Sequence, residues 1–250
     1  MPASTLLSLA VFGLAAGVGI SAVGPGGVLA TIGLYALTAL SPAQIAGTAI
    51  LTHVATGTLG TAAYVHSGQL REPETRRTAL ILAGAAVLGT PLGVLVNTAI
   101  SGKAFGLLLG AFAALIAILV WYRDRQPAVG DTQPAAMVIG AIGFGVAVAS
   151  GLLGLGGPML AVPLLVTVGL PILSALAAAQ AQSIVVAALG TLGYLVKGTI
   201  DWPLAALVGI PELAGVLIGW MIARALPTRK LKYALVILLL LLAPYLAWRG

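Results

Sequence analysis

The chain has 250 residues, of which 60% are hydrophobic and only 7% are charged, and its mean hydropathy is +1.12. Soluble globular domains carry about 25% charged residues, so this composition excludes an ordinary soluble protein and indicates a chain that lives in a lipid bilayer. The net charge is +6, but the Lys and Arg residues are spread over short loops without interleaved aromatic residues, which excludes a nucleic-acid-binding patch. The absence of cysteine excludes disulfides and thiolate chemistry, and we expect no cofactor and no metal.

The apolar runs are long and continuous, so only helices can satisfy their backbone groups in lipid, and the predicted fold class is all-α. The first run has no preceding basic residue and is interpreted as a membrane segment rather than a signal peptide. A spanning helix needs about 20 residues, so the segments 27–40 and 158–170 are predicted to be half-helices or arms of re-entrant hairpins. Gly, Pro and charge clusters divide the chain into about ten hydrophobic segments, near 5–22, 27–40, 43–66, 76–98, 103–121, 135–152, 158–170, 173–197, 203–225 and 230–248.

The two halves of the sequence are related by a shift of 130 positions, which holds without a gap from residue 24 to residue 73. We therefore predict two five-segment membrane repeats, 1–122 and 135–250, joined by a polar linker at 123–134. Because five is an odd number, the second repeat is expected to be inverted relative to the first. The shift superimposes Gly24, Gly26, Gly27 and His53 on Gly154, Gly156, Gly157 and Ser183. Further along, a shift that is four residues shorter, 126 positions, superimposes Gly89 and Gly93 on Gly215 and Gly219.

The basic residues predict the orientation of the chain in the membrane. When the segments alternate between the two sides, most of the Lys and Arg residues fall on one face, in or beside the loops 67–76, 122–134 and 224–232. Because cytoplasmic loops collect positive charge, these three loops are predicted to be cytoplasmic and both termini to lie outside. The predicted location is the cell inner membrane, as a multi-pass protein.

The two glycine-rich turns, at 21–27 and 151–158, are the strongest candidates for a functional site. Glycine allows a tight turn and lets a ligand approach the main chain. The free N–H groups at the start of the following helix carry partial positive charge and favour an anion. In an inverted pair, the turns can meet near the midplane and bind a small anionic substrate. The predicted binding residues here are Ser21, Gly24, Gly26, Gly27, Gly154, Gly156 and Gly157.

The third segment of each half carries polar residues, which are costly in lipid unless they face protein or a cavity. Thr48, Thr52 and Thr56 recur every four residues and form a stripe, although a threonine hydroxyl can also bond its own helix backbone, which leaves a structural role equally open. Gln180 and Ser183 share a helix face. The predicted binding residues of these segments are Thr52, His53, Gln180, Gln182 and Ser183.

Only two strongly ionisable side chains lie deep within the apolar segments, His53 and Glu212, and Glu212 directly follows Pro211. Proton relays in transporters are made from residues of this kind, so either residue is a candidate for proton coupling. The alternative is a structural role, in which a buried histidine bonds a neighbouring helix and a buried glutamate stays protonated.

The run from Gly151 to Pro163, its weaker copy at 21–27, the Gly198-x-x-Asp201-Trp202-Pro203 sequence and the five-plus-five layout resemble the sulfite exporter TauE/SafE family of membrane permeases. The resemblance covers nearly the whole chain. It implies a secondary transporter, expected to be an exporter, of small sulfur-containing anions such as sulfite or organosulfonates. The glycine motif of the family corresponds to Gly154, Gly156, Gly157, Pro158 and Pro163, and in the first half to Gly24, Gly26 and Gly27.

Two alternatives stay open. A passive anion channel would use the same apolar segments, although two inverted halves in one chain favour alternating access. An intramembrane enzyme would use His53 and Glu212 as acid and base, but the segments carry no Ser-His-Asp set and no His-Glu-x-x-His motif, so we expect no enzymatic activity.

Overall fold

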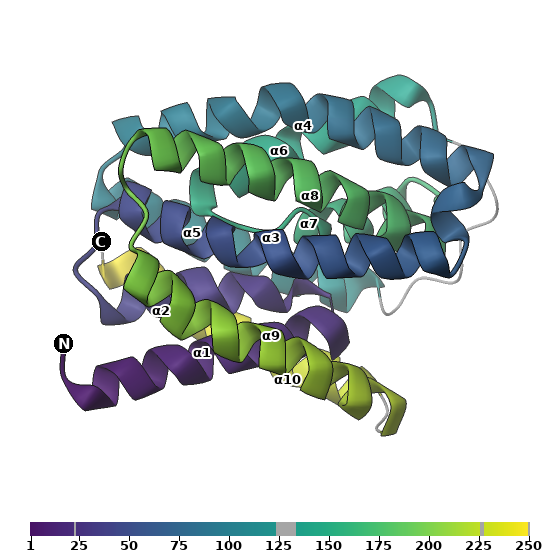
Figure 1. Ribbon diagram of the computed structural model, residues 1–250. Coiled ribbons are helices and arrows are strands. Elements are labelled where there is room, and N and C mark those ends of the chain that lie inside the picture. Colours follow the sequence, from purple (N-terminus) through teal and green to yellow (C-terminus); the bar gives the residue numbers. More distant parts are fainter. Residues whose placement is uncertain (23, 124–133, 226–227, 250) are drawn as a thin grey trace.

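The computed structural model describes residues 1–22, 24–123, 134–225 and 228–249, and within these ranges the fold is all-α, as predicted (Figure 1). Every predicted segment corresponds to one helix, with bounds that agree to within three residues. The helices are α1 (Ala3–Ala22), α2 (Val28–Leu37), α3 (Pro42–His66), α4 (Pro73–Ala99), α5 (Gly102–Arg123), α6 (Ala136–Leu153), α7 (Pro158–Thr167), α8 (Ile172–Val196), α9 (Trp202–Ala225) and α10 (Thr228–Arg249), with short 3-10 turns η1 (Pro25–Gly27) and η2 (Gln69–Arg71).

The helices fall into long and short ones, as the sequence predicts. Six helices of the described chain are long and apolar enough to cross a membrane. By contrast, α2 and α7 have 10 residues each, and at 1.5 Å per residue each is about 15 Å long, half of the roughly 30 Å hydrocarbon core. The protein is therefore a polytopic membrane protein with two helices that are too short to cross alone.

Helices from the first half pack mainly against helices from the second half. α1 lies along α9 and α6 lies along α4, while α3 packs against α8 and α5 against α10 (Figure 1). Gly47 and Gly60, near opposite ends of α3, face Tyr194 and Gln180 of α8, so α3 and α8 run antiparallel. α5 and α10 are also antiparallel, because the start of α5 at Gly106 meets the end of α10. The corresponding third and fifth helices of the two halves thus run in opposite directions.

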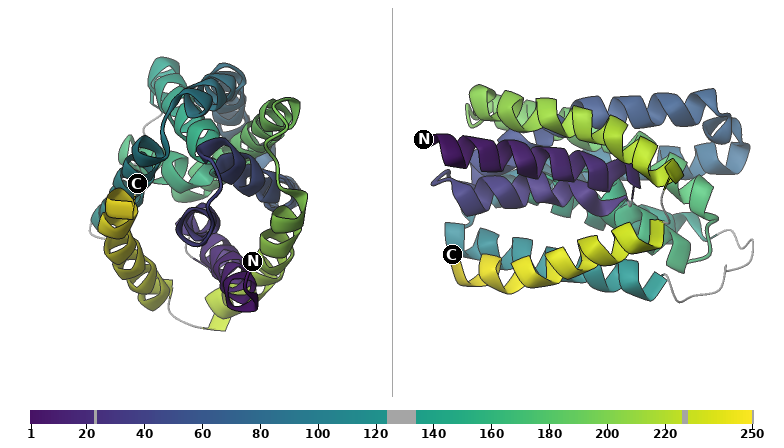
Figure 2. Two further views of the ribbon diagram at one scale, coloured as in Figure 1. Left: turned by 90° about the vertical axis from the view of Figure 1, so that its left-hand side faces the viewer. Right: turned by 90° about the horizontal axis from the view of Figure 1, so that it is seen from below.

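The bundle has its chain ends on one side. α1 begins and α10 ends at the same end of the bundle, as the purple and yellow helices in Figure 2 make visible. The η2 turn, between α3 and α4, lies at the opposite end (Figure 1). α1 and α9 run parallel to each other, because Gly13 and Gly17 of α1 lie against Val208 and Glu212 of α9.

Glycines allow the closest of these helix pairs to approach. A Cβ atom at Gly93 of α4 would overlap the backbone carbonyl of Val148 in α6, and one at Gly215 of α9 would overlap the carbonyl of Leu14 in α1. These glycines therefore serve helix packing, since small residues let helix backbones meet in membranes.

Candidate functional site

Each glycine-rich turn begins with a glycine whose backbone lies in the left-handed region. Gly24 has φ +106° and Gly154 has φ +71°, and they follow the last residues of α1 and α6 closely. The Gly24 N–H donates to Gly19 O at 2.9 Å, and the Gly154 N–H donates to Ser150 O at 2.9 Å. Residues with side chains are strained at such φ values. Both long helices therefore end just before these glycines, and the short helices α2 and α7 begin four residues after them.

The imidazole of His53 lies against both turns. A Cβ built on Gly27 would be 2.8 Å from His53 Cε1, and one built on Gly156 would be 3.7 Å from His53 Cγ. The methyl group of Met159 lies beside the same two glycines, 3.7 Å from the Gly156 Cβ position. The turn of the first half, the turn of the second half and the middle of α3 therefore meet around one histidine.

His53 and Glu212 form a buried pair. His53 Nδ1 is 3.2 Å from Glu212 Oε1, and their side chains are 2% and 0% exposed. The other imidazole nitrogen, Nε2, has no hydrogen-bond partner, and neither Glu212 oxygen accepts a hydrogen bond of good geometry from the described residues. A buried carboxylate with so little compensation is costly in its charged form.

Close packing of α1 on α9 places Glu212. A Cβ atom at Gly17 would overlap the backbone carbonyl of Glu212, so only glycine at this position lets α1 approach that turn of α9. Pro211, inside α9, has no N–H to donate to the carbonyl four residues earlier. Glu212 therefore follows a residue that cannot donate the usual helical hydrogen bond, and its backbone carbonyl packs against Gly17 of α1.

Three side chains from three helices hold the carbonyls at the end of α6. Tyr194 Oη donates to Gly151 O at 2.7 Å, Asn97 Nδ2 donates to Leu152 O at 2.6 Å, and Thr31 Oγ1 donates to Gly154 O at 3.2 Å. These bonds satisfy acceptors that the helix end leaves free. The second glycine turn is thus braced by α8, α4 and α2.

The predicted residues of α8 face two different neighbours. Gln180 lies against Gly60 of α3, and Ser183 Oγ is 3.3 Å from the Cβ position of Gly57, so the predicted shared face of these two residues is confirmed. Gln182 Nε2 instead donates to Gly143 O of α6 at 2.8 Å, while its Oε1 is buried without a partner. The structure does not bring the two glutamines together.

The predicted residues Thr52 and Ser21 face α9. Thr52 Oγ1 donates to Ala49 O of its own helix at 2.8 Å, and its methyl group is 3.1 Å from the Cβ position of Gly209. Ser21 Oγ donates to Gly17 O at 3.2 Å and lies against Gly219. These hydroxyls bond local backbone rather than pointing at His53.

Sequence reasoning missed two features of this site. Met159, directly after the second glycine turn, lies between the two turns, but an apolar residue in an apolar segment carries no signal of this placement. Asn97 is 1% exposed near the end of α4, and its amide in a membrane segment was a signal that could have singled it out.

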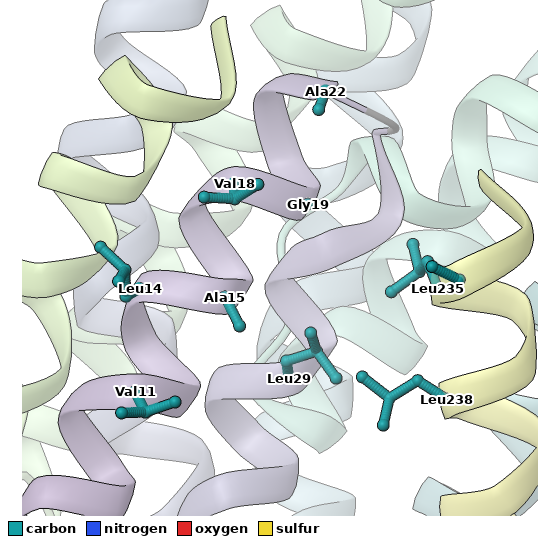
Figure 3. A pocket seen from close by; sticks show the side chains of 10 residues that line it. Val11, Leu14, Ala15, Val18, Gly19, Ala22, Leu29, Leu235 and Leu238 are labelled. Atoms are coloured by element: carbon teal, nitrogen blue, oxygen red, sulfur yellow. The ribbon is translucent and has the colours of Figure 1, made fainter. Parts of the chain in front are cut away.

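A groove elsewhere in the protein has a different character. It encloses about 300 Å³ between α1, α2 and α10, and its lining side chains are apolar (Figure 3). It offers an anion no donor, so its chemistry matches hydrocarbon rather than a charged solute. No group of three or more His, Asp or Glu side chains suited to a metal occurs in the described ranges.

Comparison with known families gives one match. The family model described as sulfite exporter TauE/SafE matches residues 9–246, which is nearly the whole chain. Comparison with curated proteins and with solved structures gives no match. The match spans both glycine turns and the His53–Glu212 pair. The chain therefore belongs to the sulfite exporter TauE/SafE family of membrane transport proteins.

Proposed function

We propose that this protein is a secondary transporter, working as an exporter, of small sulfur-containing anions such as sulfite or organosulfonates. The anion binds in the middle of the bundle, between the glycine turns at 24–27 and 154–157. The observation that carries this proposal is the convergence of both turns on His53, whose Nε2 is buried without a partner. Family membership supports the substrate class.

The depth of the site agrees with a midplane position. His53 is the twelfth residue of α3, which starts at Pro42, and Glu212 is the eleventh of α9, which starts at Trp202. At 1.5 Å per residue, each lies roughly 16 Å from the start of its helix, about half the thickness of the hydrocarbon core.

The site offers donors and little competing charge. The N–H groups at the start of α2, and those that follow Pro158 at the start of α7, have no acceptor within their own helices and carry the positive end of each helix dipole. His53 adds a side-chain donor beside Gly27. An oxyanion has several acceptor oxygens, so it can accept hydrogen bonds from both turns and from the imidazole together.

The antiparallel pairing of α3 with α8 and of α5 with α10 supports an inverted repeat. Two inverted halves around one midplane site allow alternating access, in which one half rocks against the other. The orientation that we propose places the loops 67–76, 122–134 and 224–232 in the cytoplasm and both termini outside, because the basic residues gather at those loops.

The test is transport in proteoliposomes loaded with labelled sulfite, methanesulfonate or taurine, each measured separately. We expect efflux of at least one of them from liposomes with wild-type protein, and a fall of roughly tenfold or more in His53→Ala, since a hydrogen bond to a charged group is lost. His66→Ala is the matched control, because His66 is the other histidine of α3 and is exposed at its end. If none of the three anions moves, the proposed function is wrong.

A further inference from the structure

We propose that the His53–Glu212 pair takes up one proton whenever an anion binds at the glycine turns, so that the anion and the proton occupy the centre of the bundle together. This inference rests on the proposed function, because it needs an anion at Gly27. It adds a coupling chemistry to that site. The proton comes from water on the side from which the anion enters and returns to water when the anion leaves.

The two imidazole nitrogens of His53 have different surroundings. Nδ1 faces Glu212 at 3.2 Å, while Nε2 is buried without a partner. The Cε1 atom, which joins the two nitrogens, lies against Gly27. A neutral imidazole carries a proton on only one nitrogen, whereas the imidazolium donates from both. A fully protonated ring can therefore donate to Glu212 on one side and to an anion at the turn on the other.

The helices packed around the His53–Glu212 pair carry no other Asp, Glu, Lys, Arg or His away from their ends. α3 packs mainly against α2, α4, α6, α8 and α9, and α9 packs mainly against α1 and α3. α1, α2, α6, α7 and α8 contain no Asp, Glu, Lys, Arg or His. The other titratable residues of these elements belong to helix ends or are tyrosines: His66, Arg71, Glu74, Arg76, Arg77 and Arg224, with Tyr35, Tyr64 and Tyr194.

Charge balance then sets the number of protons. A net charge in the middle of the membrane is costly, so the empty pair holds one proton more than a neutral imidazole and a carboxylate would, and has no net charge. Binding of a monoanion would leave a charge of −1. A second proton on the pair restores neutrality, and because the two groups are coupled, it belongs to the pair rather than to either residue.

The pair occurs once per chain. The shift of 130 positions places Ser183 at the counterpart of His53, and the later shift of 126 places Ala86 at the counterpart of Glu212. Neither counterpart titrates. One anion site with one proton-binding pair therefore couples one proton to each anion.

The test measures proton uptake directly in purified full-length protein by titration calorimetry. The probe is methanesulfonate, which stays ionised across the working pH range, so any proton taken up binds to the protein. Binding heats are measured at one pH in two buffers of different ionisation enthalpy. For wild-type protein we expect uptake of about one proton per anion, and an affinity that falls about tenfold for each unit of rising pH above the range where the pair gains its second proton.

The variant that removes both titrating groups is His53→Gln combined with Glu212→Gln. It keeps polar amides at both positions, and we expect weaker binding with no proton uptake and no dependence on pH. His66→Gln is the control and keeps the wild-type values, because this histidine is exposed at the end of α3. If the double variant does not fold, the two-buffer measurement on wild-type protein still decides.

The outcomes separate this inference from the proposed function. Methanesulfonate binding without proton uptake in wild-type protein, or uptake of one proton that persists in the double variant, would overturn the inference and leave the anion site intact. If methanesulfonate, sulfite and taurine all fail to bind at every pH, the anion site itself is wrong and the inference is lost with it.

Discussion

The turn at Gly27 and the turn at Gly157 occupy matching places in the two halves, and each faces the residue at the matching place of the third helix. A Cβ atom at Gly27 would meet the imidazole of His53 at 2.8 Å, and one at Gly157 would meet the Cα of Ser183 at 3.4 Å. Gly157 is 130 positions after Gly27, and Ser183 is 130 positions after His53. The backbone arrangement is therefore duplicated while the side chain that fills it is not.

The two halves share the backbone turns but not the titratable side chains. Glycines that end α1 and α6 at positive φ are present in both halves, because both halves need the same break in the helix. The titratable pair is present once, since His53 comes from the first half and Glu212 from the second. The four predictions below use matched positions of the two halves, from the largest expected effect to the smallest.

We expect the largest difference between substitutions of His53 and of its counterpart Ser183. In His53→Ala, affinity for methanesulfonate falls roughly tenfold to a hundredfold, because a charged donor beside Gly27 is lost. In Ser183→Ala, affinity changes by less than about threefold, within the 0.5 kcal/mol or so typical of a change away from a special feature. Titration calorimetry checks both. Equal losses in the two variants would mean that the halves contribute alike.

The two glycines provide the next comparison. Gly27 and Gly157 both have helical φ values, −60° and −56°, so alanine fits either backbone. In Gly27→Ala the new methyl group displaces the His53 ring, and we expect a loss of roughly 1–3 kcal/mol in anion binding. In Gly157→Ala the nearest atoms are at 3.4 Å, and binding changes by less than about 0.5 kcal/mol. A larger loss in Gly157→Ala than in Gly27→Ala would contradict the assignment of His53.

The side chains that bond the carbonyls at the end of α6 affect the stability of the protein and have a smaller effect on anion binding. Tyr194→Phe removes the hydroxyl that donates to Gly151 O and leaves a buried acceptor without its partner, at a cost of about 1–3 kcal/mol. The melting temperature in detergent falls, whereas the binding of methanesulfonate in the folded fraction stays within about threefold. Tyr64→Phe is the control, because Tyr64 of α3 lies 130 positions earlier at the matching place of the first half and is only half-buried. An unchanged melting temperature in Tyr194→Phe would show that this brace is dispensable.

We expect the smallest effect on stability and transport from Met159→Leu. Its counterpart in the first half, 130 positions earlier, is Leu29, so Met159→Leu makes the two halves alike at this position. The exchange conserves volume and should cost less than about 1.5 kcal/mol in stability, with little change in transport. Melting curves and proteoliposome flux measure the two quantities. A loss of transport as large as that of His53→Ala would mean that the thioether itself contacts the anion.

Much of the site was visible in the sequence because its signals are local. The duplicated glycines marked both turns, and His53 and Glu212 were the only strongly ionisable residues deep in apolar segments. The contact between those two residues was not predictable, because they are 159 positions apart and belong to different halves. Gln180 and Gln182 were both predicted to bind the anion, yet the two lie on different faces of α8 and reach different helices.

The amino-acid sequence by itself determined the helices, the two short helices and the glycine turns of this protein. Hydrophobic length, helix breaks and backbone freedom are properties of a few consecutive residues, so no distant contact is needed to read them. The tertiary structure alone decided that both turns meet at His53, that Glu212 faces Nδ1 and that Met159 lies between the turns. Periodicity tells which residues share a face of a helix, but the neighbour of that face depends on how whole helices pack, which only the assembled bundle specifies.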